Sequence, residues 1–251
     1  ARAGVRVVVI DRAEFPRAKA CGEGLLPHGC AVLDRLGVET SNAALLRGIR
    51  FHTQNATAWL PFPGRPGRAI SRRALDDALR LRAVAYGAEM VRARVTAIEP
   101  GGVVTDQGIL HARLLVGADG TRSIFHESFE VRVHYSRDRV GFSSHWNDAR
   151  VEAGEVNVHT FGEGELYVAP VGPGVTLAAL LVSRRFIAEA GLSMSVMNGF
   201  LRERFPDRFA TAKRVGPILG AYPLSSRVNL VAGRDWPLVG DAAGAVDPIS
   251  G

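Results

Sequence analysis

The sequence has few cysteines and no long hydrophobic run, and both absences narrow its class. Cys21 and Cys30 are the two cysteines in 251 residues, too few for the disulfide framework of a small secreted protein. No apolar stretch approaches the ~20 residues that a membrane-spanning helix needs, and no cationic, apolar leader opens the chain. We therefore expect a cytoplasmic protein without stable membrane insertion, with peripheral membrane contact left open.

Two common kinds of catalytic site are also missing. The seven histidines are dispersed and lack the spacing of a metal site, so we expect no metal. A Gly-x-Ser-x-Gly segment, which carries the nucleophile of many serine hydrolases, is absent. Neither metal-assisted hydrolysis nor Ser-His-Asp chemistry is therefore indicated.

The charge is unbalanced but not clustered. The formal net charge is +6, which admits nucleic acid as a partner. The arginines are scattered along the chain, and no DNA- or RNA-binding motif accompanies them. We therefore expect a solvated basic surface with one anion-binding cleft, and no nucleic-acid partner.

Three apolar segments end at or just before an aspartate. They are Val7–Asp11, Leu114–Gly120 and Leu238–Gly251, and their acids are Asp11, Asp119 and Asp241. An acid at the carboxyl end of a buried strand accepts hydrogen bonds from the hydroxyls of a sugar or sugar alcohol, but it does not bind phosphate. We expect the three acids to converge on one cleft.

The middle of the chain has a different texture. Apolar and polar residues alternate in short pieces between residues 131 and 182, as in an antiparallel sheet with one covered face. Helices are predicted for residues 27–36, 71–86 and 193–205. The fold class is therefore α/β with two domains: a Rossmann-like parallel sheet at residues 1–127 and 224–251, interrupted by an antiparallel substrate-binding domain at 128–223.

Four segments together carry a family resemblance. They are Val9–Arg12 with Phe15–Pro27, Ile70–Asp76, Gly117–Ser123 and Val239–Gly251. Their order resembles the geranylgeranyl reductase-like group of FAD-dependent oxidoreductases, within the p-hydroxybenzoate-hydroxylase-like flavoprotein superfamily. The resemblance implies that residues 1–127 and 224–251 form an FAD-binding domain.

The resemblance also implies roles for individual residues. FAD would be bound without a covalent bond, and NAD(P)H would be the reductant. The expected FAD-contacting residues are Asp11, Arg12, Arg17, Cys21, Gly22, Arg72, Asp119, Gly120, Gly240, Asp241, Pro248 and Gly251. Cys21 is the candidate catalytic residue, with a small buried thiol as the alternative.

The sequence departs from the family in three places. The Gly-x-Gly-x-x-Gly turn that grips the FAD pyrophosphate is absent. The sequence stops at Gly251, where a flavin-contacting helix is expected. His126 occupies a position where the family usually has arginine. We therefore expect a fragment that lacks the Gly-rich motif and the C-terminal part.

Three functions follow as hypotheses. The first is an enzyme that reduces a C=C bond in a prenyl chain by hydride transfer from reduced flavin. Trp146, Phe161, Tyr167 and Leu177 are the candidates for its apolar substrate wall. The second is a flavin-dependent monooxygenase or halogenase, and the third is a non-catalytic remnant of such a flavoprotein.

Overall fold

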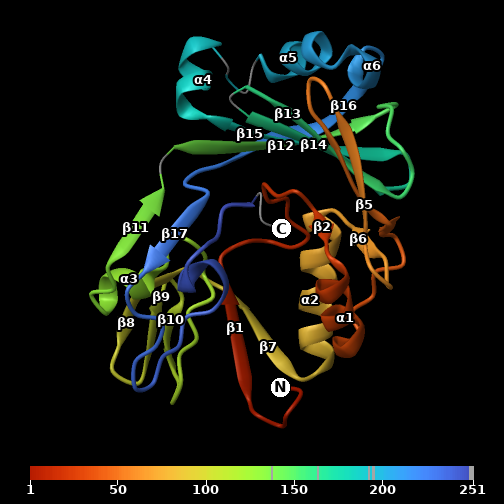
Figure 1. The fold of residues 1–251 in the computed structure, drawn as a ribbon. Helices are drawn as coiled ribbons and strands as arrows, with labels where there is room; N and C mark the ends of the chain where they lie inside the picture. The colour runs from red at the N-terminus through yellow and green to blue at the C-terminus, as the bar shows by residue number, and fades with distance from the viewer. Residues whose placement is uncertain (137, 163, 192, 194–195, 249–251) are drawn as a thin grey trace. The chain divides into compact units, whose positions relative to one another are not determined.

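The computed structural model describes residues 1–251 except 137, 163, 192, 194–195 and 249–251. The chain forms two compact units (Figure 1). Unit 1 comprises residues 1–15, 83–137 and 223–250, and unit 2 comprises residues 16–82 and 138–222. The division into an FAD-binding and a substrate-binding domain stays a prediction. None of the described helices is long and apolar enough to cross a bilayer.

Unit 1 contains short strands around a small aromatic core. Strand β1 (Val7–Asp11) pairs in parallel with β7 (Ala88–Arg92). The antiparallel elements are β8 (Val95–Glu99), β9 (Gly102–Thr105) and β10 (Gly108–His111) in one sheet, and β11 (Val133–Ser136) with β17 (Ser225–Val228) in another. Phe125 of α3 (Ile124–Ser128), Trp236 and Leu238 are buried together and form the centre of this unit.

Unit 2 is dominated by one seven-stranded sheet (Figure 1). Its strand order is β16 (Lys213–Ala221), β12 (Arg139–Asn147), β15 (Val175–Ser183), β14 (Gly164–Gly172), β13 (Glu155–Phe161), β4 (Gly48–His52) and β5 (Thr57–Pro61). Every neighbouring pair is antiparallel except β13 with β4. The predicted antiparallel sheet is therefore present, and it also includes a hairpin from residues 48–61.

One face of this sheet is covered by helices, and we call it the helix face. Its buried side chains include Trp146, Leu166 and Leu180, which pack with Met197, Leu201 and Phe209. Those three come from α5 (Met197–Arg204) and α6 (Pro206–Phe209), and α4 (Arg184–Glu189) follows β15. Period-two alternation puts these strand residues on one side and their neighbours on the other.

The opposite face packs against a small three-stranded sheet, and we call it the small-sheet face. Leu177 and Ala179 are buried there with Leu46 and Ala69, and Tyr167 packs at the edge of the cluster. The small sheet consists of β2 (Gly24–Leu25), β6 (Gly67–Ala69) and β3 (Ala44–Leu46).

Local signals in the sequence explain the two helices of residues 16–82. Helix α1 (Pro27–Leu36) has Pro27 in its first turn and ends at Gly37, whose φ of 64° is left-handed. Helix α2 (Arg72–Ala85) follows Ser71, whose hydroxyl oxygen accepts a hydrogen bond from the Ala74 N–H. Both predicted helices are confirmed.

The predicted buried strand at residues 114–118 is wrong as a strand. Gly117 makes a single parallel bridge to Leu238, and Leu114 and Val116 are more than half exposed. A regular strand needs a continuous ladder of backbone hydrogen bonds, and the described residues of this segment form one bridge.

A buried polar cluster lies where α6 meets the sheet. Arg208 is 9% exposed and donates from Nε to Nε2 of His159 at 2.8 Å, from Nη1 to Glu152 at 3.0 Å and from Nη2 to Asn157 Oδ1 at 3.0 Å. Asn157 also accepts from His52 Nε2 at 2.8 Å, and the two imidazole rings stack with centroids 4.4 Å apart.

This cluster keeps His159 neutral. Burial, followed by the nearby positive charge of Arg208, lowers the pKa of His159 to about 4. The same bond from Arg208 requires a lone pair on Nε2, so the ring proton is on Nδ1.

We predict that Leu180→Ala lowers the free energy of unfolding by about 2–5 kcal/mol, because it opens a cavity in the core of the helix face. Leu180 is 1% exposed. Leu60→Ala, at a side chain that is 52% exposed, is the control and should change stability by less than about 0.5 kcal/mol. Urea denaturation followed by near-UV circular dichroism measures both. Equal effects would contradict the placement of this core.

We predict that the melting temperature falls as the pH is lowered from 6.5 to 4, and that part of this fall disappears in His159→Gln. The unfolded chain binds a proton at His159 below pH 6.5, whereas the folded protein does so only near pH 4, so acid favours unfolding in that window. Glutamine keeps an acceptor for Arg208. Calorimetry at pH 7.5, where position 159 is neutral in both proteins, measures the loss of contacts alone. An unchanged acid slope would refute the shift.

Candidate functional site

Two predicted acids follow the partners of a parallel bridge in unit 1. Gly117 and Leu238 form this bridge, in which Gly117 N–H donates to Pro237 O at 2.9 Å and Val239 N–H to Gly117 O at 2.9 Å. The chain then reaches Asp119 two residues after Gly117 and Asp241 three residues after Leu238. The two acids therefore follow neighbouring segments that run in the same direction.

Both acids are exposed, but their local roles differ. Asp119 accepts a hydrogen bond at Oδ2 from the Ile124 N–H at 2.8 Å and so fixes the turn before α3. Gly120 permits this turn with a φ of 91°. Asp241 is in the first turn of the short 3-10 helix η1 (Gly240–Ala243), after Gly240 at a φ of 59°. Its exposed carboxylate is an acceptor for a ligand hydroxyl.

His126 links these two segments. It is buried on α3, and its Nε2 donates to the backbone oxygen of Ala242 at 2.8 Å. Its Nδ1 is buried without a hydrogen-bond partner among the described residues. The histidine that departs from the family pattern therefore holds the Asp241 segment against α3.

Asp11 ends β1, as predicted. Its Oδ1 accepts from the Ala13 N–H at 2.8 Å, so part of the carboxylate stabilises the following turn. Arg12 is exposed in that turn, and Pro248 is exposed near the end of the described chain. Gly251 lies outside the described residues.

The remaining predicted residues belong to unit 2. The segment Cys21–Gly24, which we call the Cys21 loop, leads directly into β2. Cys21 is half-buried, and its Sγ accepts from the Glu23 N–H at 3.4 Å. Gly22 is exposed, and no atom lies within 4 Å of the position where a Cβ would stand. A ligand can therefore approach the backbone of Gly22 closely.

Arg72 begins α2 beside this loop. Its Nε and Nη2 donate to the two carboxylate oxygens of Asp76 at 2.8 and 3.0 Å, and Arg17 lies 3.4 Å from the same carboxylate. Burial lowers the pKa of Arg72, whereas Asp76 and the neighbouring Cys21 raise it by a larger amount. The net shift of the Arg72 pKa is therefore upward. Two arginines contact the Asp76 carboxylate, and a second carboxylate, that of Glu23, accepts from the Arg72 N–H at 2.8 Å.

Tyr167 and Leu177 lie on the small-sheet face, the same side of the sheet as β2 and β6. Trp146 and Phe161 pack with the helix-face core instead. The four predicted residues therefore do not form one wall, because they lie on both faces of the sheet. Alternation fixes which residues of one strand share a face, but it does not show which face meets a ligand.

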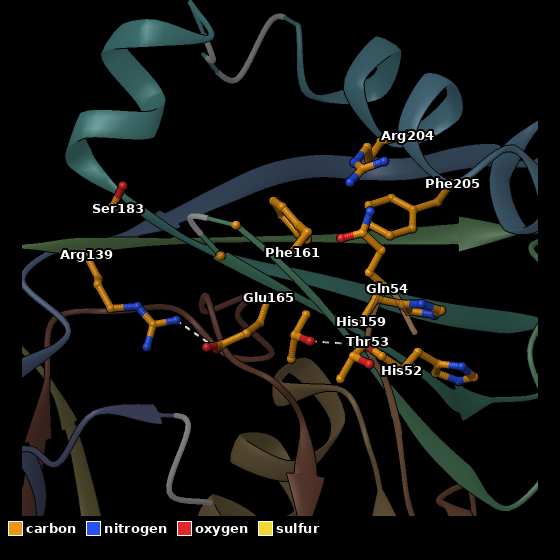
Figure 2. Close-up of a pocket in the computed structure, with 13 residues that line it drawn as sticks. His52, Thr53, Gln54, Arg139, His159, Phe161, Glu165, Ser183, Arg204 and Phe205 are labelled. Atoms are coloured by element: carbon orange, nitrogen blue, oxygen red, sulfur yellow. Dashed lines mark hydrogen bonds and ion pairs between the residues drawn. The ribbon is translucent and has the colours of Figure 1, made fainter. Parts of the chain in front are cut away.

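A separate cavity of about 800 Å³ opens at the end of the β13–β14 hairpin (Figure 2). His52, His159, Phe161 and Arg204 line it, and none of the predicted FAD-contacting residues does. The guanidinium of Arg204 lies 5.9 Å from the centre of the Phe161 ring. Arg139 Nη2 donates to Glu165 Oε2 at 2.7 Å (Figure 2), so this arginine faces an opposite charge.

Three residues of the site were missed in the sequence. Glu23 is buried, and Asp76 holds both arginines. The four-residue spacing of Arg72 and Asp76 on a helix was a usable signal. His145 of β12 contacts Glu23 across 122 residues of chain, and no local pattern could have indicated it.

The arrangement therefore has two groups of predicted residues. Unit 1 carries Asp11, Arg12, Asp119, Gly120, Gly240, Asp241 and Pro248, and unit 2 carries Arg17, Cys21, Gly22 and Arg72. That both groups face one cofactor stays a prediction. Among the residues that the structure describes, no cluster of histidine, cysteine or acid side chains could hold a metal.

Comparison with curated proteins finds reductases. The chain is 32% identical over 280 residues to menaquinone reductase of Mycolicibacterium smegmatis and 30% identical to that of Mycobacterium tuberculosis. In each case the match covers all of this chain and 67% of the relative. Digeranylgeranylglycerophospholipid reductase 2 of Methanopyrus kandleri is 28% identical, again over the whole chain.

Solved structures of low sequence identity share the fold. Flavin-dependent brominase Bmp2 superposes with a TM-score of 0.87 at 18% identity and covers 99% of this chain and 69% of its own. A flavoprotein/dehydrogenase from Cytophaga hutchinsonii gives 0.86 at 20% identity, over 99% of this chain and 68% of its own. No family model matches the sequence. The identity to the menaquinone reductases nevertheless shows that the chain belongs to the geranylgeranyl reductase-like group of FAD-dependent oxidoreductases.

Proposed function

We propose that the protein binds FAD and reduces a C=C bond in the prenyl chain of a quinone or lipid, with NAD(P)H as the electron source. The observation that carries the proposal is the pair of exposed acids, Asp119 and Asp241, which follow the two partners of one parallel bridge, Gly117 and Leu238. The relatives named for menaquinone and digeranylgeranylglycerophospholipid support the substrate class. The activity of the whole protein is part of this proposal, since the chain spans 67% of the first relatives.

The residues present fit a flavin dinucleotide. Asp11 and Asp241 offer carboxylate oxygens for the hydroxyls of ribose and of the ribityl chain. The free space over Gly22 lets backbone amides approach a flat ring. Arg72 carries a guanidinium group next to Cys21, and guanidinium groups suit the oxygens of a pyrophosphate.

Bound flavin would supply the hydride, and the protein would supply position and charge. Tyr167, which is half-buried at the edge of the small-sheet cluster, would be the contact for an apolar chain, since Leu177 is fully buried in that cluster. Saturation of an alkene also needs a proton at the second carbon. Cys21 is the candidate group of this chain, because its half-buried thiol adjoins both Gly22 and Arg72.

Oxygen-dependent chemistry is the second candidate function. Halogenases are among the structural neighbours, including the chondrochloren halogenase CndH with a TM-score of 0.86 at 24% identity. The sequence contains no Trp-x-Trp-x-Ile-Pro segment of the kind expected for such halogenases. The third candidate is a non-catalytic protein that keeps only the fold. A measurement of flavin binding distinguishes this candidate from the two enzymes.

We predict that Asp241→Ala weakens FAD binding by about 10- to 100-fold, because a hydrogen bond to a charged group contributes about 1.5–3 kcal/mol. Titration of the complete gene product with FAD, followed by quenching of flavin fluorescence, measures the dissociation constant. Asp235→Ala, an exposed acid of the same unit, is the matched control and should bind FAD like the wild type. A protein that takes up no flavin would reject the cofactor assignment.

We predict that the chemically reduced protein adds two hydrogens to a prenyl quinone or prenyl lipid in the absence of oxygen. Mass spectrometry of the extracted product detects the gain, and unreduced protein under the same conditions is the control. Products that gain oxygen or halogen only when air is admitted, with the prenyl chain still unsaturated, would establish the monooxygenase or halogenase alternative instead.

A further inference from the structure

Glu23 is an unusual residue in the Cys21 loop. It is 5% exposed, although carboxylates are rarely buried without partners. Its backbone φ of 55° is in the left-handed region, which a residue other than glycine adopts at a cost. A strained backbone and a buried charge at the same residue need specific contacts to hold them.

Those contacts join three parts of unit 2. The Oε1 atom accepts from the Arg72 N–H at 2.8 Å, where α2 begins. The Oε2 atom lies 2.7 Å from Nε2 of His145 on β12. The backbone oxygen accepts from the Ile70 N–H at 3.1 Å. Glu23 therefore connects the loop to a helix terminus and to the large sheet.

The same contacts determine where Cys21 lies. The Glu23 N–H donates to Cys21 Sγ, so the peptide that carries the strained φ also holds the thiol. Arg72, whose N–H is bound by Glu23, is the cation next to that thiol. Movement of the Glu23 side chain would therefore alter both neighbours of Cys21.

His145 is well placed to control this arrangement. Its register partner on β15 is Leu177, so it belongs to the small-sheet face. Its side chain is 24% exposed, whereas that of Glu23 is 2% exposed. The histidine is thus the outer member of the pair, and it closes the carboxylate off from solvent.

We propose that Glu23 and His145 are positioning residues for the Cys21 loop: their contact fixes the loop on α2 and the sheet, and so sets how Cys21 and Gly22 face a ligand. The inference deepens the proposed function, in which this loop adjoins the flavin. A buried pair of this kind adds little to stability compared with apolar side chains. We therefore assign it the role of fixing the local geometry of the loop.

The test is the rate at which iodoacetamide alkylates Cys21 in the complete gene product, resolved by peptide mass spectrometry. His145→Phe keeps the bulk and removes the N–H donor, and we expect at least a fivefold faster reaction. His145→Gln keeps a donor and should stay within twofold of the wild type. Trypsin cleavage after Arg17 and Lys19 under native conditions should accelerate in His145→Phe but not in His145→Gln.

Two controls separate a loosened loop from a damaged fold. Cys30 is 4% exposed and should remain unreactive in every variant. Glu155→Gln breaks a comparable pair, Arg50 with Glu155 at 2.6 and 2.7 Å, away from the loop, and should leave Cys21 as in the wild type. His145→Asn is a second, smaller substitution with the same expected direction as His145→Phe.

Three results would overturn the proposal. Cys21 could react at the wild-type rate in both His145→Phe and His145→Asn. His145→Gln could accelerate the reaction as much as His145→Phe, without rescue by the donor. Cys30 could become as reactive as Cys21, which would show that the pair stabilises the whole unit. The assay needs no flavin, so failure of FAD binding would leave its result intact.

Discussion

Successive side chains of a strand point to opposite faces, and unit 2 depends on this constraint. On β12, Trp146 is fully buried against Phe209 of α6, whereas its neighbour His145 reaches Glu23 on the other side. On β14, Leu166 belongs to the helix-face core and Tyr167 to the small-sheet face. Residues that are adjacent in the sequence thus contribute to a stabilising core on one face of the sheet and to the surroundings of the Cys21 loop on the other.

Local features of the fold could be predicted from the sequence. The ends of α1 and α2 follow from Pro27, Gly37 and Ser71, because capping depends on a few adjacent residues. The antiparallel strands of the middle segment could be predicted from the alternation of its apolar and polar residues. The strand expected at residues 114–118 does not form, because regular pairing depends on neighbours elsewhere in the chain.

The candidate site shows the same boundary between local and long-range information. The bridge between Gly117 and Leu238 brings the Asp119 and Asp241 segments together, as the motif order indicated. The contacts of Glu23 with His145, and of His126 with Ala242, link residues more than 100 positions apart. Such long-range contacts produce no periodic pattern in the sequence. The four candidates for the substrate wall lie on both faces of the sheet for a related reason, since alternation within one strand does not show which residues of different strands share a face.

The parallel pairing of β4 with β13 constrains the order of folding. Residues 48–52 receive their second neighbour only when residues 155–159 have been made, so the early hairpin of β4 and β5 waits for about a hundred further residues to leave the ribosome. Leu46 and Ala69, which are buried in the finished protein, lack their neighbours Leu177 and Ala179 until those later residues have also been made. Such non-local pairing slows folding and leaves apolar segments open to chaperones or aggregation during synthesis.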